Sequence, residues 1–176
     1  VLEGTEYYNA DIVYKDGRLW MAWLEYIPGK GDHILVGVRE KGQWQFKEKV
    51  TESPGLFAHP TLSVDEKNGL WLSYECQPKE SGNWDIFVRK QREDNKWGRP
   101  VQISKGSGNS INHSTAANGD TVWFVGQQDR DGQFDVMCRS VRIGREQVKM
   151  SAPEVLSDSG FGDWEPQVTV NSKGQV

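Results

Sequence analysis

The sequence predicts an all-β chain: a β-propeller segment of about three four-stranded antiparallel blades, with the start of a fourth. Two observations support this prediction. Short runs of alternating apolar and polar residues are separated by turn-forming residues, and the whole pattern recurs about every fifty residues. Four strands per repeat at this period are typical of propellers, in which neighbouring blades cover each other's faces.

The clearest copy of the repeat covers residues 58–104. Glycine, asparagine, proline and charged residues fill its connections, and tight turns of this kind join antiparallel neighbours. The copy is therefore expected to be a meander of four strands. The alternation places them at Thr61–Val64, Leu70–Tyr74, Asp85–Lys90 and Val101–Ile103.

Repeated markers give the register of the other copies. A turn followed by tryptophan recurs at Trp20, Trp71 and Trp123, which lie 51 and 52 positions apart. The predicted third strand Asp85–Arg89 returns as Asp135–Arg139. A sheet of four strands cannot bury both faces alone, so we interpret the repeated tryptophans as packing between blades.

These markers divide the chain into successive blades. Because propellers typically have four to eight blades, three and a fraction do not close a ring. We therefore expect the remaining blades to come from a longer chain or from partner chains. The division gives the end of a preceding blade at 1–8, blades at 9–57, 58–111 and 112–164, and an incomplete blade at 165–176.

Composition and charge exclude several classes of partner. The net charge is −4, charges of both signs are interspersed and no run of Lys or Arg occurs, so nucleic acid is not expected as a partner. No apolar run approaches the roughly 20 residues that a membrane helix needs. Cys76 and Cys138 have neither metal-knuckle nor redox spacing, which leaves two free thiols or a bridge between adjacent blades.

Polar residues precede the first strand of each copy. In a propeller these strands are innermost and start on one face, where loops on a rigid scaffold usually carry binding. The alternative is structural, because such residues can also bond the backbone of a neighbouring blade or ordered water. The residues that we expect to ring the channel mouth are Asn9, His59, His113 and Glu165.

Aromatic residues stand close to this predicted ring, at Tyr8, Phe57 and Trp164. A polar ring with aromatic neighbours suits a carbohydrate or another polar ligand with a flat face. A protein is the other candidate ligand.

Catalytic and metal-binding motifs give little further direction. The sequence has no nucleophile elbow, phosphate-binding loop or zinc-protease motif, and no two acidic residues can be paired as acid and base. No cofactor is expected and no metal is assigned. If a divalent metal is bound, His59, His113 and Glu165 are its candidate ligands, since imidazole and carboxylate groups suit such ions.

Several motifs together resemble a known kind of repeat. The stretches Pro60–Trp71, Gly82–Ile86 and Trp97–Ser104 are similar to bacterial exported β-propeller repeats of the TolB-like and sialidase-like kind. They also resemble propellers that precede a predicted metal-dependent hydrolase domain. The resemblance covers nearly the whole chain and implies a periplasmic, secreted or cell-surface location. The third copy departs from it, since Gly126 stands where the second has Tyr74.

Two functions follow from these expectations. The first is a non-catalytic binding or scaffold module of a larger exported protein, with a carbohydrate or protein ligand at the channel mouth. The alternative is part of a propeller-fold polysaccharide hydrolase or lyase with its site at the same place; such an enzyme would be a glycoside hydrolase or a polysaccharide lyase. Propellers of this kind host binding, scaffolding and hydrolysis alike, so the resemblance does not choose between the two.

Overall fold

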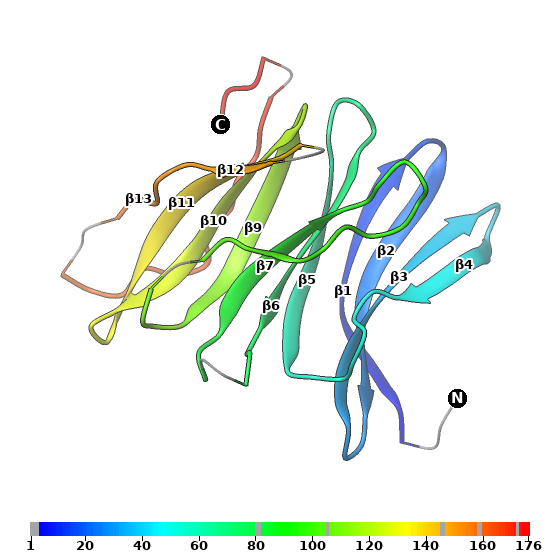
Figure 1. Cartoon of the computed structure of the whole chain (residues 1–176), viewed down its shortest axis with the longest axis horizontal. Helices are drawn as coiled ribbons and strands as arrows, with labels where there is room; N and C mark the ends of the chain where they lie inside the picture. Colours follow the sequence, from blue (N-terminus) through cyan, green and yellow to red (C-terminus); the bar gives the residue numbers. More distant parts are fainter. Residues whose placement is uncertain (1–3, 80–81, 105, 145–146, 158–159, 172) are drawn as a thin grey trace.

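The computed structural model describes residues 4–79, 82–104, 106–144, 147–157, 160–171 and 173–176. Its strands form three antiparallel sheets that follow one another along the chain (Figure 1). The sheet orders are β1-β2-β3-β4, β5-β6-β7-β8 and β12-β11-β10-β9, with β13 also pairing β11. The prediction of successive four-stranded antiparallel units is confirmed.

We call the three sheets blade one, blade two and blade three. Blade one contains β1 (Glu6–Lys15), β2 (Arg18–Ile27), β3 (Gly31–Glu40) and β4 (Gln43–Lys49). Blade two contains β5 (Phe57–Val64), β6 (Leu70–Cys76), β7 (Asp85–Lys90) and β8 (Val101–Gln102). Blade three contains β9 (Ser110–Asn118), β10 (Thr121–Arg130), β11 (Gln133–Ile143), β12 (Val148–Met150) and β13 (Glu154–Val155).

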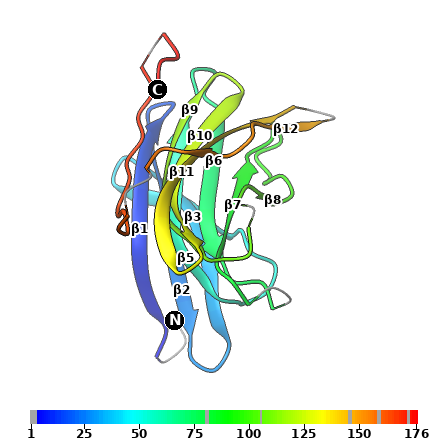
Figure 2. The ribbon, with the colours of Figure 1, turned by 90° about the vertical axis from the view of Figure 1, so that its left-hand side faces the viewer.

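The first strands of the blades are neighbours on one side of the molecule. Figure 2 shows β1 and the C-terminal segment at one edge and β8 and β12 towards the opposite edge. We call β1, β5 and β9 the inner strands. The described part of the chain has no helix with the length and apolar character needed to cross a membrane.

Each inner strand starts before the predicted blade boundary: β1 begins at Glu6, β5 at Phe57 and β9 at Ser110. The strands extend further because each continues through a β-bulge, across which its pairing with the second strand of the blade shifts register. Residues 1–3, which belong to the strand predicted to close a preceding blade, lie outside the described residues.

The predicted alignment of the third repeat is wrong by one position, as the left-handed residue at each bulge shows. Asn9, His59 and Glu165 have φ angles of 49°, 47° and 53°, and the residue of the third copy with this left-handed backbone is Asn112, at 50°. His113, which the sequence analysis aligned with His59, therefore stands one position later. The error arose because both copies contain histidine, whereas the conserved feature of the repeats is backbone conformation, which asparagine and histidine adopt more readily than most residues.

The hydrophobic core lies between the blades. One cluster joins blades one and two and includes Trp20, Leu24 and Leu72. A second joins blades two and three and includes Trp71 and Val122. Trp20 and Trp71 thus pack towards the following blade, in agreement with the predicted packing between blades, whereas Trp123 is partly buried and belongs to neither cluster. Each fully buried leucine contributes about 1.5–3 kcal/mol to stability.

The two cysteines are unpaired. Cys76 and Cys138 are both free thiols, which selects one of the two alternatives left open by the sequence. Burial, with the negative charge of Asp85, raises the pKa of the Cys76 thiol to about 11. This thiol is therefore protonated and weakly reactive at neutral pH.

The Asp65 carboxylate holds the turn that precedes Trp71. Its Oδ1 accepts hydrogen bonds from the backbone N–H groups of Lys67 (2.9 Å) and Gly69 (2.7 Å). Its Oδ2 accepts the indole N–H of Trp71 at 3.0 Å and lies 3.3 Å from Nζ of Lys90. One buried carboxylate therefore fixes both the hairpin and the orientation of a core tryptophan.

We expect Asp65→Ala to lower the free energy of unfolding by about 3 kcal/mol, because it leaves buried N–H donors without an acceptor. Denaturant unfolding of the chain measures this change. The matched control is Asp94→Ala in the exposed turn between β7 and β8, expected to change stability by less than about 0.5 kcal/mol. Equal effects of the two substitutions would contradict the role of Asp65 in fixing this hairpin.

Candidate functional site

The inner strands and the segment after residue 164 border an open cavity of about 760 Å³, which we call the channel-mouth cavity. Strands of all three blades contribute to its wall, so it lies where the sequence analysis expected a channel. The wall is mainly polar. It is lined by Asn9, Ala10, Asp11, Ala58, His59, Pro60, Thr61, Leu62, Glu75, Asn112, His113, Ser114, Thr115, Gln167 and Val168.

Some of these polar groups join neighbouring blades. Asp11 Oδ2 accepts the backbone N–H of Leu62 at 2.7 Å, and Ser114 Oγ accepts that of Val168 at 3.3 Å. Asp11 and Ser114 both stand two positions after the left-handed residue of their strand. The same inter-blade bond therefore recurs in the repeat, which supports the structural interpretation for these two side chains.

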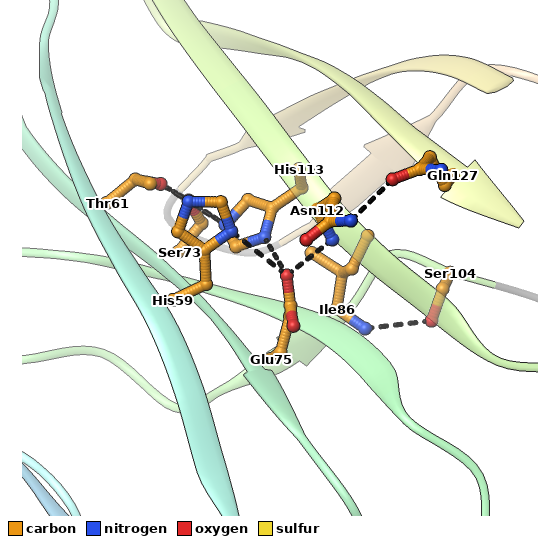
Figure 3. A network of polar contacts seen from close by, with 9 residues as sticks. All are labelled: His59, Thr61, Ser73, Glu75, Ile86, Ser104, Asn112, His113 and Gln127. Carbon is orange, nitrogen blue, oxygen red and sulfur yellow. Dashed lines mark hydrogen bonds and ion pairs between the residues drawn. The ribbon is translucent and has the colours of Figure 1, made fainter. Parts of the chain in front are cut away.

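The Glu75 carboxylate is the centre of a polar cluster between blades two and three (Figure 3). Glu75 lies on β6 opposite Ala58, directly beside the bulge at His59. Its Oε1 accepts the backbone N–H of Asn112 at 2.7 Å and lies 3.2 Å from Nδ1 of His59 and 3.3 Å from Nδ1 of His113. Three nitrogen atoms from two inner strands thus converge on one oxygen.

The other nitrogen of His113 is also bonded. Its Nε2 lies 3.0 Å from Ser73 Oγ and 3.2 Å from Thr61 Oγ1, and the two hydroxyls bond each other at 2.5 Å. His113 is fully buried, whereas the His59 side chain is 45% exposed towards solvent. The His113 ring is therefore hydrogen-bonded on both nitrogens, and the His59 ring is accessible from the cavity.

Gln127 occupies the position in blade three that Glu75 has in blade two. It is fully buried; its Oε1 accepts Nδ2–H of Asn112 at 2.6 Å, and its Nε2–H donates to the carbonyl of Asp163 at 2.8 Å. Counting from the repeated tryptophans, the equivalent residue of blade one is Leu24.

Sequence reasoning missed Glu75 and Gln127, although a signal was present. Glu75 is a charged residue in a second strand that is otherwise largely apolar, and both Glu75 and Gln127 stand where the first copy has the apolar Leu24. A position-by-position comparison of the three second strands would have found both.

The predicted ring residues are only partly brought together. Asn9, His59 and His113 line the channel-mouth cavity. Glu165 is exposed and is not part of the lining, although the nearby Gln167 is. The two histidines predicted as metal ligands do meet, but with Glu75 in the place given to Glu165. The reason is topological: Glu75 pairs beside His59 within one blade, whereas Glu165 follows the whole of blade three.

The three predicted aromatic residues pack elsewhere and do not line this cavity. The Tyr8 hydroxyl donates to Asp32, and burial, together with this carboxylate, raises the pKa of Tyr8. The other two pack on nearby aromatic rings. Phe57 lies 5.9 Å from Tyr74 and Trp164 lies 5.4 Å from Phe134, measured between ring centroids.

The cluster has a definite charge distribution. Burial raises the pKa of Glu75, but the hydrogen bonds and charges of His113 and His59 outweigh burial and lower that pKa to about 2. The hydrogen bond to Glu75 raises the pKa of His59, whereas burial lowers that of His113. The carboxylate is therefore ionised at neutral pH, and a proton taken up by the two imidazoles resides on the accessible His59.

This arrangement predicts an acid-sensitive contribution to stability. The folded pKa of Glu75 is depressed from 4.5 to about 2, so its contribution is fully present above pH 4.5 and is lost as the pH falls towards 2. The difference corresponds to at most about 3 kcal/mol of unfolding free energy. Denaturant unfolding of the chain at several pH values in this window measures it.

Glu75→Gln is the control for this experiment, because it keeps the shape of the side chain and removes its titration. The variant should be less stable at pH 6 and should lack this part of the acid-dependent loss. If stability falls equally with pH in the unmodified chain and in Glu75→Gln, Glu75 is not the source of the acid-dependent loss.

Comparison with solved structures identifies the fold. A thermostable family-43 glycoside hydrolase superposes with a TM-score of 0.62 at 9% identity, over 96% of this chain and 62% of the other. An α-L-arabinofuranosidase from Lactobacillus brevis gives 0.61 at 11% identity, over 96% and 62%. The endo-arabinase from Bacteroides thetaiotaomicron VPI-5482 gives 0.57 at 16% identity, over 85% and 61%.

No family model and no curated protein sequence matches the chain. The structural similarity therefore defines the class of protein by its fold: the chain is a β-propeller segment, as the sequence predicted. It spans about 62% of the length of the first of these neighbours.

Proposed function

We propose that the channel-mouth cavity binds a carbohydrate and that the blades described here do not hydrolyse it. The observation that carries the proposal is the wall of the cavity, where amide, hydroxyl and imidazole groups from successive inner strands face one space. Groups of this kind hydrogen-bond sugar hydroxyls. The fold adds support, because its structural neighbours include proteins described as glycoside hydrolases.

The carboxylates of the cavity argue for binding over hydrolysis. Glycoside hydrolysis usually needs two carboxyl groups on either side of the scissile bond, one of them protonated. Glu75 is buried and ionised, which disfavours it as a general acid. Asp11 accepts backbone N–H groups on both oxygens, from Ile12 at 2.8 Å and Leu62 at 2.7 Å. Both carboxylates are thus engaged within the protein.

Hydrolysis is the second candidate, because the structural neighbours are described as glycosidases. Glu165 then becomes the candidate acid, since it is exposed next to the cavity segment Gln167–Val168. Its partner would come from blades outside the residues described here. A lyase acting on polysaccharide remains within this alternative, and an exported location stays a prediction of the sequence resemblance.

Binding can be tested with linear arabino-oligosaccharides, titrated calorimetrically into the chain. We expect saturable binding that Asn9→Gly and Gln167→Ala each weaken about tenfold, since each removes a hydrogen-bonding group worth about 1 kcal/mol or more. Glycine at position 9 keeps the left-handed backbone there. Asn95→Gly is the matched control, since Asn95 has φ 62° in the turn after β7, at the other end of the strands.

The same samples decide between the two candidates when release of reducing ends is followed. If reducing ends are released and Glu165→Gln abolishes this release, hydrolysis replaces binding as the proposed function. Absence of binding, or equal binding by the cavity variants and the control, would overturn the carbohydrate proposal.

A further inference from the structure

We propose that His59, Glu75 and His113 form a binding site for a divalent transition-metal ion of the zinc type in the wall of the channel-mouth cavity. The three residues come from β5, β6 and β9, so the ion would join blade two to blade three. Metal binding can be measured without a saccharide, and the inference therefore does not depend on the proposed function.

The distances fit a coordination polyhedron. One ligand atom from each of the three residues lies within 4.8 Å of the others. Glu75 Oε1 lies 3.2 Å and 3.3 Å from the Nδ1 atoms of the two histidines. Zinc bonds to nitrogen and oxygen of about 2.0–2.1 Å give tetrahedral edges of about 3.3 Å. Two edges of such a tetrahedron are thus present between the Glu75 oxygen and the two histidine nitrogens.

The surroundings orient the ligands as metal sites require. Metal-binding histidines usually donate the N–H of the other ring nitrogen to an acceptor, which fixes the tautomer. Nε2 of His113 has two such acceptors, Ser73 Oγ at 3.0 Å and Thr61 Oγ1 at 3.2 Å. The Glu75 oxygen is itself held by the backbone N–H of Asn112 at 2.7 Å. Two of the three ligands are therefore pre-oriented.

Burial and charge favour a cation at this position. Glu75 and His113 are buried, while His59 is 45% exposed and faces the cavity, so a bound ion keeps a position open towards it. The negative charge of Asp11 also acts on both imidazoles. Two imidazoles, one carboxylate and an open position form the ligand set of many zinc sites.

Without an ion, the same atoms form a hydrogen-bond network in which both imidazoles and Asn112 share one carboxylate oxygen. The network alone explains the position of His113, which is bonded on both nitrogens. The two interpretations differ in one measurable property, which is saturable affinity for a metal.

The test is calorimetric titration of the chelator-treated chain with Zn²⁺, repeated with Co²⁺ while its visible absorption is recorded. We expect one ion per chain and Co²⁺ bands characteristic of nitrogen ligation. His59→Gly, which keeps the left-handed backbone, and Glu75→Gln should each weaken binding more than about 100-fold, and Ser73→Ala about tenfold. Zn²⁺ should raise the unfolding temperature of the unmodified chain and leave that of His59→Gly unchanged.

The controls are Asn95→Gly, with the same backbone conformation outside the cavity, and His33→Gln, at the only other histidine of the chain. His33 is buried in blade one, where its Nδ1 lies 3.0 Å from Thr51 Oγ1. Both variants should bind Zn²⁺ like the unmodified chain. Lack of saturable binding, or equal affinity in His59→Gly and Asn95→Gly, would overturn the proposal and leave the hydrogen-bond network.

Discussion

Burial of the Glu75 carboxylate between two blades constrains the arrangement of the site. A buried charge is strongly destabilising unless it is paired and hydrogen-bonded. Here the donors come from the bulge of blade two, at His59, and from the bulge of blade three, at Asn112 and His113. The carboxylate therefore requires both inner strands to keep their left-handed residues in place, which ties the shape of the cavity wall to the packing of the blades.

The equivalent positions in the three blades show how one repeat supports different interfaces. Leu24 of blade one is fully buried in the apolar cluster between blades one and two. Glu75 binds the start of β9, and Gln127 binds the carbonyl of Asp163, at the start of the following segment. A repeat needs contact with its neighbour at this place, but the contact can be hydrophobic, ionic or amide-mediated.

The regular features of the fold followed from the sequence because they depend on local patterns. Alternation placed the third strand of blade two at Asp85–Lys90, where the structure has it, and Trp20 and Trp71 identified the inter-blade core. The bulges did not follow, because one inserted backbone residue is invisible to apolar periodicity. Without them the third copy was aligned by residue type, which matched His113 instead of Asn112 with His59.

The candidate site was predictable only in part. Both histidines were named because they precede predicted strands. Glu75 lies in the second strand of its blade and reaches the cavity because it pairs with Ala58, next to His59. The three aromatic residues were placed by proximity in sequence alone. Tyr8 and Phe57 instead satisfy contacts within their own blades, with Asp32 and Tyr74.

The contrast between Leu24 and Glu75 bears on why the polar cluster exists. An apolar residue fills this position in blade one, so the propeller does not need a charge there to assemble. Replacing a buried ionic cluster by well-packed apolar residues is often neutral or stabilising. Stability alone therefore gives little reason for a carboxylate and two imidazoles at one interface. The cluster reaches the cavity through the accessible ring of His59, as the proposed metal site requires. The inner strands thus carry both the contacts between blades and part of the wall of the cavity.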